Sequence, residues 1–139
     1  MHHILFICNR NSCCSIMAEA LFNHIGKMGY VALSAGSSPV GHVHPTTLST
    51  LKKNNVLFEG LRSKSWNEFS HQPIYAVVAA CTEILDEDWP LFAGKPARIH
   101  WDISDPAKAR GTDVEIDAVF DSAFLRIEEN VRKLIEKLP

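Results

Sequence analysis

The sequence lacks the features that would place it in a membrane or on a nucleic acid. No apolar run approaches the roughly 20 residues that a membrane-spanning helix needs. No Lys or Arg precedes the short N-terminal apolar run, as one would in a secretory signal peptide. The formal net charge is -2, so no excess of positive charge attracts polyanions. We therefore expect a cytoplasmic protein without a nucleic-acid or membrane partner.

Cysteine is scarce, and its distribution argues against a framework of disulfide bridges. Only four cysteines occur in 139 residues: Cys8, Cys13 and Cys14 crowd into one loop, whereas Cys81 stands apart. A chain of this length builds one hydrophobic core without the support of disulfides. The crowded loop therefore indicates thiol chemistry or metal binding rather than structural bridges.

Short apolar runs alternate with amphipathic segments along the chain. The runs 4–8, 31–36, 74–81 and 97–104 are continuous rather than alternating in polarity, which is typical of buried parallel strands. Helices are expected from residue 12 or 15 to 28, over 44–55, and from a capping box at Thr112 and Glu115 to about 138. We predict one α/β domain over residues 1–139, with a four-stranded parallel sheet flanked by helices on both faces.

The loop Cys8–Ser15 follows the first expected strand and leads into a helix. Unpaired N–H groups and the positive end of the helix dipole make such a loop a cradle for anions. The same groups lower the pKa of a thiol at its base, which favours Cys8 as a nucleophilic thiolate. The alternative interpretation of Cys8 is a strand-end cysteine packed in the core.

Two further side chains fall at or just after the carboxyl ends of expected strands, where functional loops of parallel sheets lie. Cys81 ends the most apolar run, and Asp105 precedes Pro106, which keeps the aspartate out of helical geometry. A positioned carboxylic acid delivers a proton to a leaving group. A core role for Cys81 and a turn-capping role for Asp105 remain open as alternatives.

These residues resemble the arsenate reductases that are built on the low-molecular-weight tyrosine phosphatase fold. The loop of that family is Cys, five residues, Arg and Ser, followed by a helix. Five positions match this pattern: Cys8, Asn11, Cys13, Ser15 and Glu19. The resemblance continues through SAG at 34–36, VHP at 43–45, GLRSKSW at 60–66, VVAAC at 77–81 and HWDISDPAK at 100–108. It spans nearly the whole chain.

The resemblance implies a role for each of these residues. Cys8 resembles the nucleophile that attacks arsenic, Asp105 the general acid, and Cys81 the second redox thiol, with which Cys8 forms a disulfide as arsenite leaves. The anion would be held by the loop residues Cys8, Asn9, Arg10, Asn11, Ser12, Cys13, Cys14 and Ser15. The polar residues that would support the loop are Asn11, Glu19 and Ser34. No metal is expected, since Ser65 stands where the potassium site of some arsenate reductases has an aspartate.

The sequence departs from that family at the loop arginine, whose place is taken by Cys14. A guanidinium there forks onto two oxygens of the anion and favours the thiolate of Cys8. Losing one such transition-state donor costs on the order of 10²–10³ in rate. Arg10 lies in the same loop, and its side chain is expected to point away from the cradle.

A second departure concerns the recycling of the disulfide. Trp89 stands where thioredoxin-linked arsenate reductases carry a third cysteine. We expect no bound cofactor and an external thiol reductant, either glutathione with glutaredoxin or thioredoxin. Cys13 or Cys14 is an alternative resolving thiol within the loop.

The leading prediction is a thiol-dependent arsenate reductase, weakened by the missing arginine. Its partners would be an inorganic oxyanion, arsenate or phosphate, and a thiol redox protein. A phosphomonoesterase of the tyrosine phosphatase type is the first alternative, although the segment 103–110 lacks the aromatic residues that such enzymes carry beside the general acid. The second alternative is a protein that binds an anion, arsenite or a thiophilic metal without turnover.

Overall fold

The computed structural model describes residues 1–139 and is built on a four-stranded sheet with the strand order β2-β1-β3-β4. The strands are β1 (His2–Cys8), β2 (Tyr30–Gly36), β3 (Ala76–Ala79) and β4 (Ala97–His100). Every pairing within the sheet is parallel. The fold class predicted from the continuous apolar runs is therefore confirmed.

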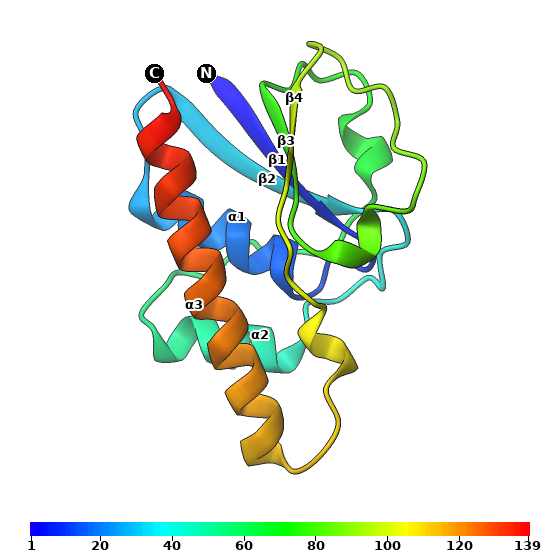
Figure 1. The fold of residues 1–139 in the computed structure, drawn as a ribbon. Coiled ribbons are helices and arrows are strands. Elements are labelled where there is room, and N and C mark those ends of the chain that lie inside the picture. The colour runs from blue at the N-terminus through cyan, green and yellow to red at the C-terminus, as the bar shows by residue number, and fades with distance from the viewer.

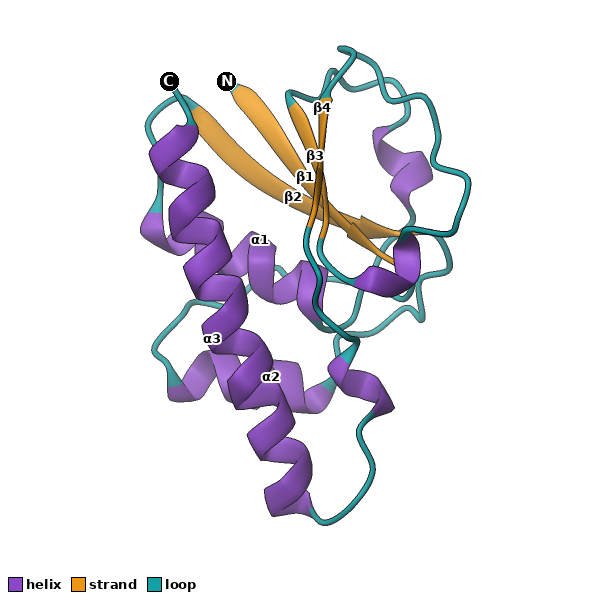
Figure 2. Cartoon of the chain, in the orientation of Figure 1, coloured by secondary structure: helices purple, strands orange, loops and turns teal.

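Helices flank the sheet on both sides (Figures 1 and 2). The α-helices are α1 (Cys14–Ile25), α2 (Pro45–Lys53) and α3 (Asp113–Lys137), and the 3-10 helices are η1 (Trp66–Phe69), η2 (Thr82–Ile84) and η3 (Pro106–Lys108). Figure 1 shows α1 and α3 on one side of the sheet and η1 on the other. The capping box of Thr112 and Glu115 opens α3 as predicted. No helix combines the length and the apolar character needed to cross a bilayer.

The strands β3 and β4 are shorter than their apolar runs. Beyond His100 the chain leaves the sheet, and the carbonyl oxygen of Ile103 accepts a hydrogen bond from the backbone N–H of Thr82 in η2. This contact holds the segment before Asp105 beside the segment that follows β3. Both segments contribute buried apolar residues: Ala80 and Ile84 after β3, and Trp101 and Ile103 after β4. The apolar runs are therefore longer than the strands that they contain.

The carboxyl ends of the strands form the edge that carries the loop. Cys8 is the last residue of β1 and pairs with Gly36, the last residue of β2. A Cβ atom at Gly36 would lie 2.5 Å from the carbonyl oxygen of Asn9. Only glycine therefore lets the loop after β1 run this close to β2.

Candidate active site

A narrow pocket lies at the carboxyl edge of the sheet. It is lined by Cys8, Arg10, Ser12, Cys13, Cys14, Cys81 and Asp105. The structure thus brings together Cys8, Cys81 and Asp105, the three residues that the sequence singles out as catalytic.

The environment of Cys8 favours its thiolate. Its Sγ atom accepts a hydrogen bond from the backbone N–H of Asn11 at 3.1 Å and lies 2.8 Å from the hydroxyl of Ser15. The pKa of the Cys8 thiol is lowered to about 7, and hydrogen bonding from the Cys81 side chain is the largest cause. Burial opposes this shift, and the contacts with Ser15 and Asn11 add to it.

The other three thiols remain protonated near neutral pH. Burial raises the pKa of Cys13 to about 12, and burial also raises the pKa of Cys14. Interaction with the Cys8 side chain and burial raise the pKa of Cys81. Cys8 is therefore the one cysteine with an accessible thiolate form, although four sulfur atoms share the pocket.

We expect Cys8 to be alkylated by iodoacetamide with a midpoint near pH 7, because its pKa is lowered to about 7 and only the thiolate reacts. The rate should rise as the pH rises through this midpoint. Cys81→Ala should move the midpoint upward, since it removes the largest stabilising contact. Peptide mass mapping at each pH measures this, with Cys13→Ala as the control. An unchanged midpoint in Cys81→Ala would contradict the assigned cause.

A row of polar side chains lies beneath the loop. Asn11 has a positive φ of 51°, and its Nδ2 donates to Ser15 Oγ at 2.8 Å and to Ser34 Oγ at 3.1 Å. The hydroxyl of Ser34 in turn donates to Glu19 Oε1 at 2.5 Å. The three residues expected to support the loop thus form one continuous hydrogen-bonded row that ends at Cys8.

The sequence comparisons place these features in a known family. Residues 3–139 match the family described as low molecular weight phosphotyrosine protein phosphatase. The chain belongs to this family. An arsenate reductase of Halalkalibacterium halodurans is 32% identical over 133 residues, which cover 96% of this chain and 91% of that protein. A glutaredoxin arsenate reductase of Synechocystis is 26% identical over 149 residues, with 99% of both chains covered.

The solved structures agree with this assignment to the phosphatase family. An arsenate reductase in the phosphate-binding state superposes with a TM-score of 0.78 at 26% identity, and the match covers 100% of both chains. The resemblance seen in the sequence is therefore confirmed for the fold and the family, and the relatives are named arsenate reductases.

Asp105 lies at the pocket and also caps a 3-10 helix. It lines the cysteine pocket, and its Oδ1 accepts a hydrogen bond from the backbone N–H of Ala107 at 2.9 Å, which caps η3. The backbone N–H of Asp105 donates to Glu83 Oε2 at 3.2 Å, and the ammonium of Lys108 lies 2.8 Å from the same oxygen. Glu83 and Lys108 therefore hold the Asp105 segment in place, a function that their sequence neighbourhood does not signal.

Asn9 and Arg10 lie at the border of the pocket. The side-chain nitrogen of Asn9 donates to Glu87 Oε2 at 2.5 Å, which ties the loop to the segment after η2, and its Oδ1 lies 3.8 Å from the Cys81 thiol. Arg10 is exposed and is one of the residues that line the pocket.

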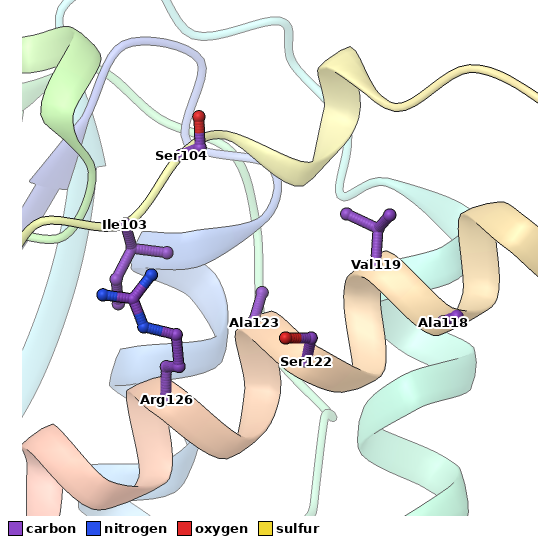
Figure 3. A pocket seen from close by; sticks show the side chains of 7 residues that line it. All are labelled: Ile103, Ser104, Ala118, Val119, Ser122, Ala123 and Arg126. Atoms are coloured by element: carbon purple, nitrogen blue, oxygen red, sulfur yellow. The ribbon is translucent and has the colours of Figure 1, made fainter.

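A wider hollow of about 330 Å³ lies between the segment Ile103–Ser104 and residues 118–126 of α3 (Figure 3). Arg126 reaches across this hollow, and its guanidinium donates to the carbonyl oxygen of Asp102. The hollow contains neither a thiol nor a carboxylate. The cysteine pocket, although narrower, is the one that carries reactive groups. No cluster of three or more His, Cys, Asp or Glu side chains has an arrangement that suits a metal ion.

Proposed function

We propose that the protein reduces arsenate to arsenite, with Cys8 as the nucleophile and Cys81 as the resolving thiol. One observation carries the proposal: Cys8, Cys81 and Asp105 line one pocket, and the Cys8 sulfur receives a hydrogen bond from the backbone N–H of Asn11 and contacts the Ser15 hydroxyl. A nucleophile and its resolving thiol need this proximity. The strand order accounts for it, because β1 and β3 are neighbours and both sulfurs follow their carboxyl ends.

The reaction has two chemical steps. The Cys8 thiolate first attacks arsenic and forms an S–As bond, and one arsenate oxygen leaves as water with a proton from Asp105. The Cys81 thiol then passes its proton to the Asp105 carboxylate, which lines the same pocket, and attacks the Cys8 sulfur. The S–As electron pair moves to arsenic, which is reduced from As(V) to As(III) and leaves as arsenite. The two thiols are oxidised to one disulfide.

The loop that follows β1 supplies the site for the oxyanion. Its backbone N–H groups and the N-terminus of α1 would bind arsenate beside Cys8.

An external thiol must return the disulfide to two thiols. The Synechocystis relative is named a glutaredoxin arsenate reductase, which supports glutathione with glutaredoxin as the reductant here. Trp89 at the position of a third relay cysteine favours the same choice over thioredoxin. All four cysteines are free, and this cycle suits the reducing cytoplasm.

A turnover assay tests the proposal. Reduced protein is incubated with arsenate and with either glutathione and glutaredoxin or thioredoxin and its reductase, and arsenite is quantified by chromatography. We expect thiol-dependent arsenite formation that is faster with glutaredoxin. Binding of arsenate without arsenite formation under both conditions would instead support the binding protein without turnover.

Hydrolysis of a phosphomonoester is the second candidate function, and membership of the phosphatase family is the observation that favours it. It uses Cys8 and Asp105 but needs no resolving thiol. Hydrolysis of para-nitrophenyl phosphate that survives Cys81→Ser, combined with absent arsenite formation, would establish this function.

We expect Cys14→Arg to raise kcat/KM for arsenate on the order of 10²-fold, because it restores a preorganised donor for the anion. The new cation should also lower the pKa of Cys8 and move its alkylation midpoint downward. Cys14→Ser is the matched control, since it removes the thiol without adding charge. No change in rate or midpoint would mean that Arg10 already supplies the cation. Loss of activity in both variants would show that Cys14 is a working thiol.

A further inference from the structure

Lys64 is a buried cation close to the active-site loop. Only 7% of its side chain is exposed. Its ammonium donates to the carbonyl oxygen of Arg62 at 3.0 Å and to Ser34 Oγ at 3.4 Å, and it lies 3.6 Å from Glu19 Oε1. Lysine is almost never buried unless its charge is paired. Burial lowers the pKa of Lys64, and the charge of Glu19 opposes that shift.

The ion pair controls the direction of the hydrogen bonds beneath the loop. An ionised carboxylate only accepts, so the Ser34 hydroxyl donates to Glu19 and offers a lone pair to Asn11 Nδ2. The second N–H of that amide donates to Ser15 Oγ. The hydroxyl proton of Ser15 is therefore available for the Cys8 sulfur, 2.8 Å away.

The backbone of Lys64 also orients the Asn11 side chain. Its N–H donates to Asn11 Oδ1 at 2.8 Å, which sets the amide so that Nδ2 faces both serines. With the amide turned the other way, its oxygen would face Ser15, and the Ser15 hydroxyl would donate to Asn11 instead of Cys8. The Cys8 thiolate would then lose a charge-assisted hydrogen bond.

We propose that Lys64 is a positioning residue: its buried ammonium, paired with Glu19 and bonded to Ser34, holds the polar row in the order that directs the Ser15 hydroxyl toward the Cys8 thiolate. It acts through Glu19, Ser34, Asn11 and Ser15 and touches no substrate. The inference rests on the proposed role of Cys8 as the nucleophile.

Other ionisable groups surround the two ends of this row. Near Lys64 they are Glu19 on α1, Arg62 on its own loop and Glu68 on η1. Around Cys8 they are Arg10, Cys13, Cys14, Cys81 and Asp105. The substitutions at Lys64 and Glu19 leave the groups around Cys8 in place, so a change in Cys8 reactivity would report on the row that joins the two ends.

The test is the pH dependence of Cys8 alkylation in four variants. Lys64→Met removes the charge, and Lys64→Arg keeps it. Glu19→Gln/Lys64→Met removes both members of the pair and so avoids an unpaired buried carboxylate. Lys53→Met is the matched control, since Lys53 forms an ion pair with Asp121 on the surface, where 53% of its side chain is exposed.

We expect Lys64→Met and the double variant to alkylate Cys8 about five- to tenfold more slowly at pH 7, with the midpoint moved upward, as the loss of one hydrogen bond to a charged group predicts. Lys64→Arg and Lys53→Met should match the wild type. If Lys64→Met does not fold, the double variant decides the question. A wild-type midpoint in the double variant, or a folded Lys64→Arg as slow as Lys64→Met, would overturn the proposal.

Alkylation needs no arsenate, so the two proposals fail separately. A protein that makes no arsenite but shows the shifted midpoint would refute the reductase function and leave the role of Lys64 in place. Arsenite formation together with an unshifted midpoint would support the reductase function and refute the role of Lys64.

Discussion

Cys8→Ser is expected to abolish arsenite formation, with a loss on the order of 10⁶ in rate, the scale observed when an enzyme loses its nucleophile. Serine nearly preserves the shape of the cysteine, and the backbone ladder of β1 does not depend on the side chain. Its hydroxyl stays protonated at neutral pH, whereas the pKa of the Cys8 thiol is lowered to about 7. A hydroxyl also cannot form the disulfide that carries the two electrons.

Cys13→Ser is the matched control for this experiment, because Cys13 lines the same pocket but its pKa is raised to about 12 by burial. It should retain most of the wild-type rate. Arsenite formation is measured in the presence of glutathione and glutaredoxin, and thermal unfolding checks that each variant folds. Substantial turnover in Cys8→Ser would transfer the nucleophilic role to Cys13 or Cys14 and refute the mechanism.

Asp105→Asn should slow arsenate reduction by about 10²–10⁴, the contribution of a positioned general acid. The amide oxygen of asparagine can still accept the hydrogen bond from Ala107 that caps η3. The contacts from Glu83 to the backbone of residue 105 are also preserved. The substitution therefore removes the proton donor and leaves the local fold intact, so the thermal midpoint should change little.

The steady-state rates of Asp105→Asn and Asp102→Asn decide between the two roles of Asp105. Asp102 is an exposed aspartate in the same segment and should be replaceable without loss of rate. If Asp105→Asn lowers the melting temperature but leaves the rate of the folded protein unchanged, Asp105 is a turn cap and not an acid.

Much of the fold follows from patterns that are local in the sequence. Continuous apolar runs indicate buried parallel strands, and the capping box at Thr112 and Glu115 marks the start of α3. The length of β4 was not predictable in this way. Within the run 97–104, only Trp101 and Ile103 are buried beyond His100, and the backbone of Ile103 bonds to Thr82 of η2 rather than extending the ladder.

The convergence of Cys8, Cys81 and Asp105 was predictable because parallel strands bring their carboxyl ends to one edge. Of the residues that support the loop, the sequence predicted Asn11, Glu19 and Ser34 but not Lys64. Lys64 stands between two serines in a polar loop, and nothing in that stretch distinguishes it from a surface lysine. Its burial depends on Glu19, which lies on a different element, so only the three-dimensional structure reveals the pair.

A single-turnover experiment tests the central claim most directly. Fully reduced protein is mixed with arsenate in the absence of any external thiol, quenched with acid, and analysed for arsenite and for disulfide-linked peptides. The proposed mechanism predicts that each arsenite formed is matched by one Cys8–Cys81 disulfide, with Cys13 and Cys14 remaining free. Arsenite accompanied by a Cys8–Cys13 or Cys8–Cys14 bridge, or arsenite formed while Cys81 stays reduced, would contradict it.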